Sequence, residues 1–99
     1  MYKRQILHRN YRWGHNEIDI VALKQNTLIF VEVKTRNSAY FGLPESAITL
    51  HKQKQLIKAA NAYVKEFKRT EEVQFDVVSV ILNNKTQSTK HIKDAFYAT

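Results

Sequence analysis

Hydrophobic positions along the chain predict strands on both sides of one helix. Two runs rich in β-branched and aromatic residues, EIDIVAL at 17–23 and LIFVEVK at 28–34, are separated by four polar residues, which is typical of a β-hairpin. The second run is apolar at nearly every position up to Glu32, so we expect both of its faces to be covered, as in the middle of a sheet. QILHRNYR at 5–12 predicts a first strand, and a turn cluster, WGHN, follows it.

The second half of the chain carries the one strong helical pattern, at residues 50–68. Its apolar stripe consists of Leu56, Ile57, Ala60, Tyr63, Val64 and Phe67. A polar loop at 35–44 precedes this helix, a buried strand is expected at 73–82, and an edge strand or short terminal element at 90–97. Because strand, helix and strand follow one another, a right-handed crossover should join parallel strands. The predicted fold class is therefore α/β, with a mixed sheet in which an antiparallel three-strand meander is followed by a crossover helix and a parallel strand.

Length and composition limit the organisation further. A chain of 99 residues corresponds to a single domain, 1–99. It has no cysteine, which excludes disulfides, thiolate zinc sites and cysteine nucleophiles. No apolar run approaches the roughly 18 residues of a membrane span, and the charged start does not fit a signal peptide. We therefore expect a cytoplasmic protein with no membrane partner.

The formal charge of +7 favours a polyanionic partner, and nucleic acid is the first candidate. Excess positive charge also serves solubility, so a solvated surface is the alternative. A second copy of the chain, in a homodimer, is a further candidate partner. The candidate nucleic-acid-binding residues are Arg9, Arg12, Arg36, Lys52, Lys54 and Lys58.

Two carboxylates on the predicted hairpin form the candidate chemical site. If the turn is symmetric about Gln25 and Asn26, Asp19 faces Glu32 on one side of the sheet with β-carbons about 5 Å apart. Glu17 would then face Lys34, which shares a face with Glu32. Carboxylates this close repel each other unless a cation lies between them, and hard oxygen ligands suit Mg²⁺ or Mn²⁺. Such a metal could activate water beside a scissile phosphate, with Lys34 orienting the water or stabilising charge.

Weaker readings stay open at this point. An E-x-K string is common by composition, and a cross-strand Glu–Lys pair is ordinary on surfaces. Gln53 points from the helix toward the sheet, where it could support the carboxylates or hydrogen-bond to backbone, and Lys52 lies at the rim of the same face. Other residues fit structural roles better. They comprise the four scattered histidines, Asp76 as a buried carboxylate satisfied by backbone or Arg, and three aromatics that could stack on bases or fold back on the core: Trp13, Tyr40 and Phe41.

A series of motifs resembles a known family. In order they are R-N-Y-R, E-I-D-I-V-A, I-F-V-E-V-K-T-R, F-G-x-P-E, K-x-x-x-L-I-K-A-A, F-D-V-V and H-I-x-D-A-F. From Ile6 to Tyr97 the chain resembles the YraN-like bacterial family, which looks like a branch of the PD-(D/E)XK, or restriction-endonuclease-like, superfamily and is similar to archaeal Holliday-junction resolvases. The resemblance implies a restriction-endonuclease-like fold and metal-dependent hydrolysis of structured or branched DNA. It places the superfamily aspartate on Asp19 and the E-x-K pair on Glu32 and Lys34.

The chain departs from the family pattern in two places. Family members generally begin with a helix that carries a Gly-Glu pair, and from the resemblance we expect this sequence to start after that helix. The usual G-E-I-D stands here as Asn16-Glu17-Ile18-Asp19, which keeps both acids. The leading hypothesis is a Mg²⁺- or Mn²⁺-dependent endonuclease-like domain with metal ligands Asp19 and Glu32, and with Lys34, Glu17 and Gln53 assisting. The alternatives are a non-catalytic nucleic-acid-binding module and a protein-interaction domain on the same fold.

Overall fold

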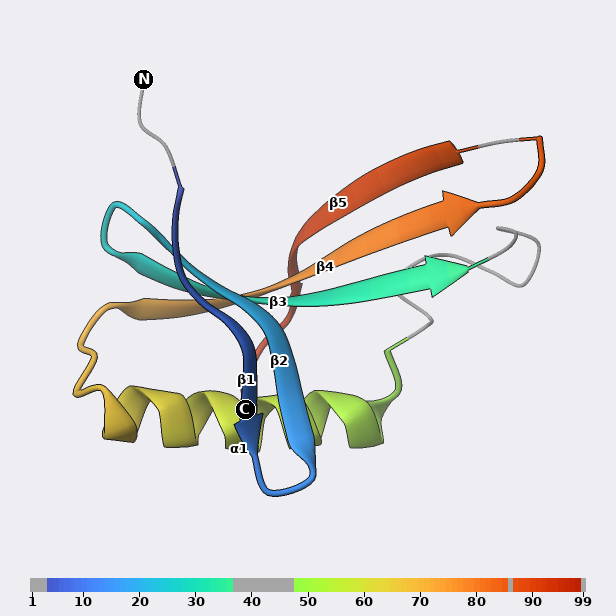
Figure 1. The fold of residues 1–99 in the computed structure, drawn as a ribbon. Helices are drawn as coiled ribbons and strands as arrows, with labels where there is room; N and C mark the ends of the chain where they lie inside the picture. The colour runs from blue at the N-terminus through green and yellow to red at the C-terminus, as the bar shows by residue number, and fades with distance from the viewer. Residues whose placement is uncertain (1–3, 37–47, 86, 99) are drawn as a thin grey trace.

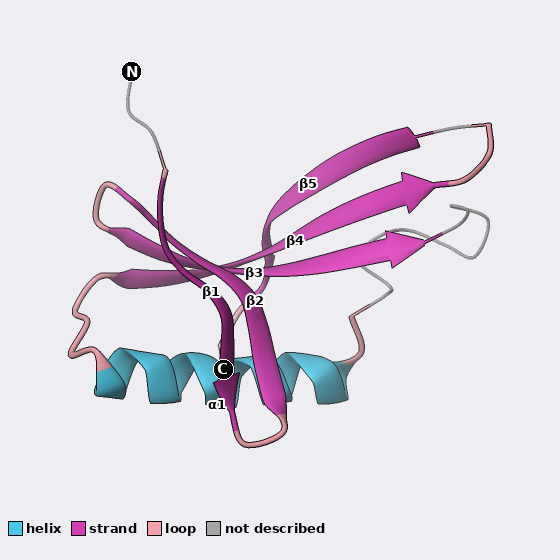
Figure 2. Cartoon of the chain, in the orientation of Figure 1, coloured by secondary structure: helices cyan, strands magenta, loops and turns pink. Residues whose placement is uncertain are grey.

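The fold is seen in a computed structural model, which describes residues 4–36, 48–85 and 87–98. These residues form a mixed α/β arrangement (Figures 1 and 2). Its elements in chain order are β1 (Gln5–Trp13), β2 (Asn16–Lys24), β3 (Thr27–Arg36), α1 (Leu50–Glu66), β4 (Glu72–Leu82) and β5 (Gln87–Phe96). The predicted loop at 35–44 starts later than expected, because β3 includes Thr35 and Arg36. The rest of that loop, with Tyr40 and Phe41, lies outside the described residues.

The five strands form one sheet in the order β1-β2-β3-β4-β5. The first three strands are an antiparallel meander, and β4 pairs in parallel with β3 after the crossover through α1. Strand β5 then returns antiparallel to β4 at the edge, beginning three residues earlier than expected. The predicted fold class is therefore confirmed, and β3 occupies the centre of the sheet.

Short turns set the register of the meander. Gly14 lies between β1 and β2 with a φ of 61°, a left-handed conformation that glycine takes at no steric cost. The β2–β3 turn consists of Gln25 and Asn26, with Lys24 paired to Thr27. The turn is symmetric about Gln25 and Asn26, as the sequence predicts. This symmetry fixes which side chains of β2 and β3 face one another.

Helix α1 begins after Thr49, whose hydroxyl oxygen accepts a hydrogen bond from the backbone N–H of Lys52 at 3.1 Å. It ends at Glu66, two residues before the predicted end, since Lys68 has a φ of 53° and cannot continue a right-handed helix. Phe67 is therefore outside the helix and 42% exposed, contrary to the predicted stripe. Ala59, absent from that prediction, is fully buried instead.

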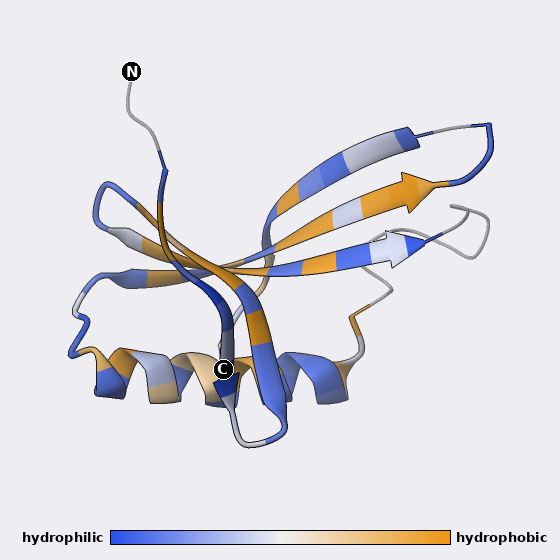
Figure 3. Cartoon of the chain, viewed as in Figure 1, coloured by the Kyte–Doolittle hydropathy of each residue, from blue (hydrophilic) through white to orange (hydrophobic). Residues whose placement is uncertain are grey.

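Apolar side chains cover both faces of the sheet. On one face α1 packs over aromatic and aliphatic residues of the strands, among them Phe30, Phe75 and Val77, and Tyr63 enters from the helix. Because strand residues alternate, a second and smaller group occupies the other face, with Ala22, Ile29 and Val31 at its centre. Both faces of β3 are buried, as its unbroken apolar run predicts, whereas polar and apolar residues alternate at its carboxyl end (Figure 3).

Within residues 4–36, 48–85 and 87–98, no helix combines the length and apolar character needed to cross a membrane.

Candidate metal centre

Strands β2 and β3 separate at Asp19. Their pairing follows the predicted register from Lys24–Thr27 up to Ile20–Val31 and stops there. Beyond this pair, the backbone N–H of Val33 has no partner on β2 in the strand pairing. It donates instead to the side chain of Asp19, whose Oδ2 accepts the hydrogen bond at 2.7 Å. This bond holds the Asp19 carboxylate at the point where the two strands part.

Glu32 lies next to Asp19 on the face of β3 that α1 covers. Because Glu32 is two residues after Phe30, the two side chains share the face of the main core. Only 7% of the Glu32 surface is exposed. Burial, a hydrogen bond to the Asp19 carboxylate and the charge of that carboxylate raise the pKa of Glu32 from 4.5 to about 7, against the opposing effect of two lysines. The predicted meeting of the two carboxylates is therefore present in the structure.

Two lysines surround the pair. Lys52, from the first turn of α1, places its Nζ 3.6 Å from Glu32 Oε2. Lys34 lies two residues beyond Glu32 on the same face of β3 and also favours the charged form of that carboxyl. Lys34 is paired with the buried Ser79 of β4, so the cluster lies at the centre of the sheet.

The donor set suits a hard divalent cation. Two adjacent carboxylates, one of which has a raised pKa, are oxygen ligands of the kind that Mg²⁺ and Mn²⁺ take in proteins. Across the described part of the chain no group of three or more His, Cys, Asp or Glu side chains could hold a metal. The two carboxylates Asp19 and Glu32 are therefore the protein ligands that this site offers.

Two residues that were candidates to support the carboxylates have other partners in the structure. Glu17 does not face Lys34. It is opposite Arg12 on β1 and forms an ion pair with it at 3.2 Å, because β2 has already left β3 at this level. Gln53 takes the second of its two predicted roles, since its Nε2 donates to the backbone carbonyl of Ile48 at 3.2 Å, and so it supports the start of α1.

Comparisons with known proteins identify the family. The model of an uncharacterised protein family, UPF0102, matches residues 2–80. The chain belongs to this family. A UPF0102 protein of Bacteroides thetaiotaomicron is 50% identical over 92 residues, which cover 93% of this chain and 76% of that protein. UPF0102 proteins of Parabacteroides distasonis and Chloroherpeton thalassium are 43% and 45% identical over 93 and 101 residues, which cover 94% and 93% of this chain and 77% and 78% of the relatives.

The candidate nucleic-acid-binding residues of this UPF0102 chain are spread over three elements. Arg9 and Arg12 lie exposed on β1, and Arg36 is the last residue of β3. On α1, Lys54 and Lys58 are exposed, whereas Lys52 turns toward Glu32. The structure thus assigns Lys52 to the carboxylate cluster and leaves the other basic residues on the surface.

The sequence predicted the buried carboxylate of Asp76 but not its histidine partner. Asp76 is buried, as expected, and its Oδ1 accepts hydrogen bonds from Gln74 Nε2 at 2.8 Å and from the backbone N–H of Asp94 at 3.1 Å. Its Oδ2 lies 2.6 Å from His91 Nε2, so a histidine takes the place of the expected arginine. Arg4 can only donate, to His91 Nδ1, and the His91 Nε2–H therefore donates to Asp76. The sequence carries no signal for this pair, because the pairing of β4 with β5 is irregular at Asp76.

Proposed function

We propose that this UPF0102 chain is a Mg²⁺- or Mn²⁺-dependent endonuclease-like domain that hydrolyses phosphodiester bonds in structured or branched DNA. The observation that carries the proposal is the contact between the Asp19 and Glu32 carboxylates where β2 and β3 separate, with Lys34 and Lys52 beside them. Glu32 is 7% exposed, and burying a charge there is costly. A role in cation binding would explain why an acid is buried at this position.

Each side chain then has a chemical task. Asp19 and Glu32 would hold the metal, which when bound lowers the pKa of a coordinated water and offsets charge on the phosphate. Lys34, on the same face as Glu32, would orient the attacking water or stabilise the charge that develops on the phosphate oxygens. Lys52 compensates the Glu32 charge before a metal arrives and is free to contact a phosphate afterwards.

The arrangement of the chain supports the likeness to the PD-(D/E)XK superfamily. An antiparallel meander, a crossover helix and a parallel strand surround the carboxylates, and the acid of β2 precedes the E-x-K sequence of β3. These features agree with the resemblance of the sequence motifs to archaeal Holliday-junction resolvases. The family itself is uncharacterised, so the reaction is our proposal.

Metal binding is the first test. Calorimetric titration with Mn²⁺ should show binding to the wild type and at least tenfold weaker binding to the double variant Asp19→Asn, Glu32→Gln. Asparagine keeps an oxygen that can accept the Val33 N–H, so the variant removes charge without removing that hydrogen bond. The matched control is Glu72→Gln on the exposed start of β4, which should bind Mn²⁺ as the wild type does. Equal affinities in all three proteins would refute the metal site.

Cleavage is the second test. The wild type should be assayed on a four-way junction, a flap and a linear duplex with Mg²⁺ and with Mn²⁺. Lys34→Ala should bind metal and DNA but lose cleavage, because its task lies in the transition state. Lys93→Ala on the exposed edge strand is the control and should cleave normally. Cleavage by Lys34→Ala at the wild-type rate would contradict the assigned role of that lysine.

A second candidate function is a nucleic-acid-binding module without catalysis. The exposed basic residues favour it, because they do not depend on the carboxylates. Salt-dependent binding of DNA with no cleavage of any substrate, even at high protein and metal concentrations, would favour this reading over the nuclease. A protein-interaction domain remains the outcome if no nucleic acid binds at low salt.

A further inference from the structure

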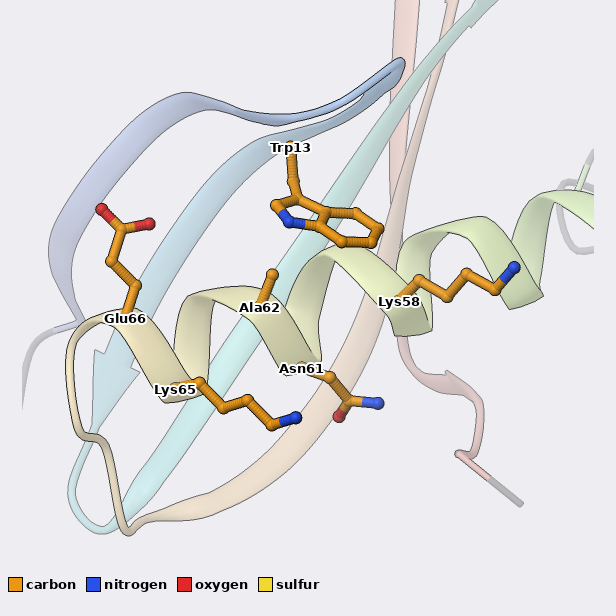
Figure 4. Close-up of a pocket in the computed structure, with 6 residues that line it drawn as sticks. All are labelled: Trp13, Lys58, Asn61, Ala62, Lys65 and Glu66. Carbon is orange, nitrogen blue, oxygen red and sulfur yellow. The ribbon is translucent and has the colours of Figure 1, made fainter.

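A pocket lies between the β1–β2 turn and the outer side of α1. It has a volume of about 480 Å³ and is lined by Trp13, Lys58, Asn61, Ala62, Lys65 and Glu66. Figure 4 shows the Trp13 indole above Ala62, with Asn61 between Lys58 and Lys65 and with Glu66 at the opposite end of the group from Lys58. None of these residues takes part in the carboxylate cluster. We name this feature the Trp13 pocket.

Trp13 is an unusual residue to leave in such a position. It is the only tryptophan of the chain, and 46% of its surface is exposed. A tryptophan that served only to cover the core would bury most of its ring system. The turn instead holds the indole beside solvent, where a flat ligand can stack on it.

The charges around the indole select the ligand. Lys58 and Lys65 are separated by two helical turns on one face of α1, with Asn61 on the same face. The Glu66 carboxylate points away from the two lysines (Figure 4), and its Oε1 accepts a hydrogen bond from the Tyr11 hydroxyl at 2.9 Å. An aromatic platform between two cations, with an amide that can reach a base edge, fits a base carrying phosphates on both sides.

We propose that the Trp13 pocket binds one unpaired nucleotide of a single-stranded nucleic acid. Its base stacks on the Trp13 indole, its flanking phosphates contact Lys58 and Lys65, and Asn61 faces the edge of the base. This inference rests on the nucleic-acid partner of the proposed function, but on neither the metal nor cleavage. It names unpaired or distorted regions, which branched DNA contains, as the part of the substrate that the surface recognises.

The fluorescence of Trp13 provides a direct test, because no other tryptophan contributes to the signal. An eight-nucleotide single strand of deoxythymidine, added at low salt without metal, should quench this fluorescence saturably. A blunt duplex should quench it much less, since its bases are already stacked. Binding is measured independently by the anisotropy of a labelled strand.

Variants separate stacking from charge. Trp13→Ala should weaken binding of the single strand by about 5- to 150-fold, the range that loss of one base–aromatic stack gives, whereas Trp13→Phe should retain most of the affinity. Lys58→Gln and Lys65→Gln should each reduce the magnitude of the slope of log affinity against log salt by about 0.7, the value of one phosphate contact on a single strand. Lys93→Gln removes one charge from β5 and serves as the charge control, which should show a much smaller effect.

Each outcome decides between the proposals. Binding without quenching of Trp13, or unchanged affinity of Trp13→Ala, overturns the pocket and leaves the proposed nuclease standing. Stacking on Trp13 without metal binding or cleavage supports the pocket and refutes the nuclease. No binding of any single-stranded, duplex or branched nucleic acid at low salt refutes both. Circular dichroism of Trp13→Ala should match the wild type, because the residue is half exposed at a turn.

Discussion

Replacing Glu32 with glutamine should stabilise the metal-free protein at alkaline pH. The folded protein holds the Glu32 proton more tightly than the unfolded chain does, because burial and Asp19 raise the pKa of Glu32 from 4.5 to about 7. Between these two values the folded state binds more protons than the unfolded state. The free energy of unfolding of the wild type must therefore fall as pH rises through this window.

The structure sets the size of this effect. A pKa rise from 4.5 to about 7 corresponds to about 3 kcal/mol at most, with about 1.4 kcal/mol for each tenfold change in proton affinity. Lys52, whose side chain is 35% exposed, contributes through partly screened charge, so we expect about 1 to 3 kcal/mol. Glutamine carries no charge and can still donate a hydrogen bond to Asp19, so Glu32→Gln avoids the loss. The two proteins should differ little in stability near pH 4 and most near pH 8.5.

Urea unfolding of both proteins in the presence of a chelator measures the difference. Unfolding curves are recorded at pH 4, 5.5, 7 and 8.5, followed by circular dichroism. The difference between the two free energies of unfolding is then plotted against pH, which cancels the titration of the carboxyls that do not interact with Glu32. A difference that stays constant from pH 4 to 8.5 would refute the raised pKa of Glu32. Added Mn²⁺ should restore the wild type at pH 8.5 and leave Glu32→Gln nearly unaffected.

Three further variants test other parts of the structure. Glu71→Gln should destabilise the protein, whereas Glu32→Gln stabilises it, since Arg69 lowers the pKa of Glu71. The thermal stability of Glu71→Gln should fall below that of the wild type at pH 7 but match it near pH 2.5. Asp76→Ala should lose several kcal/mol in urea unfolding, because it removes a buried carboxylate that accepts hydrogen bonds from donors on both β4 and β5, and a loss below about 1 kcal/mol would contradict this. Tyr11→Phe should cost about 1 kcal/mol by removing the hydrogen bond to Glu66, and a neutral effect would show that the bond is not formed in solution.

The sequence was sufficient to predict the meeting of Asp19 and Glu32. Register in a hairpin follows from the turn, and the symmetric turn at Gln25 and Asn26 determines every pair up to Ile20–Val31. Local rules then stop being sufficient. The separation of β2 from β3 depends on how β2 bends toward α1, which is a property of the whole packed domain. Glu17 lies beyond that point, and this is why its predicted pairing with Lys34 was wrong.

Helix geometry was informative in a similar way. The helical period correctly directed Lys52 toward the sheet, but it could not tell which partner each polar side chain of the first turn would find. The longer Lys52 side chain reaches Glu32, whereas Gln53 finds the carbonyl of Ile48 one turn earlier. The partner of Asp76 was unpredictable for another reason, because the pairing of β4 with β5 shifts between Phe75 and Val77. Periodicity along one strand does not reveal such an irregularity.

The hydrogen bond from the Val33 N–H to Asp19 has a consequence for how sequences of this kind can diverge. Asp19 closes the gap between two strands whether or not a metal is present, so loss of catalysis would not remove the need for it. Glu32 gives the metal-free fold no such benefit and lowers its stability at neutral pH. In a lineage that had abandoned metal chemistry, position 32 should drift to glutamine or an apolar residue while position 19 keeps an acid or asparagine. An intact glutamate at position 32 is therefore a better marker of a working centre than the aspartate that accompanies it.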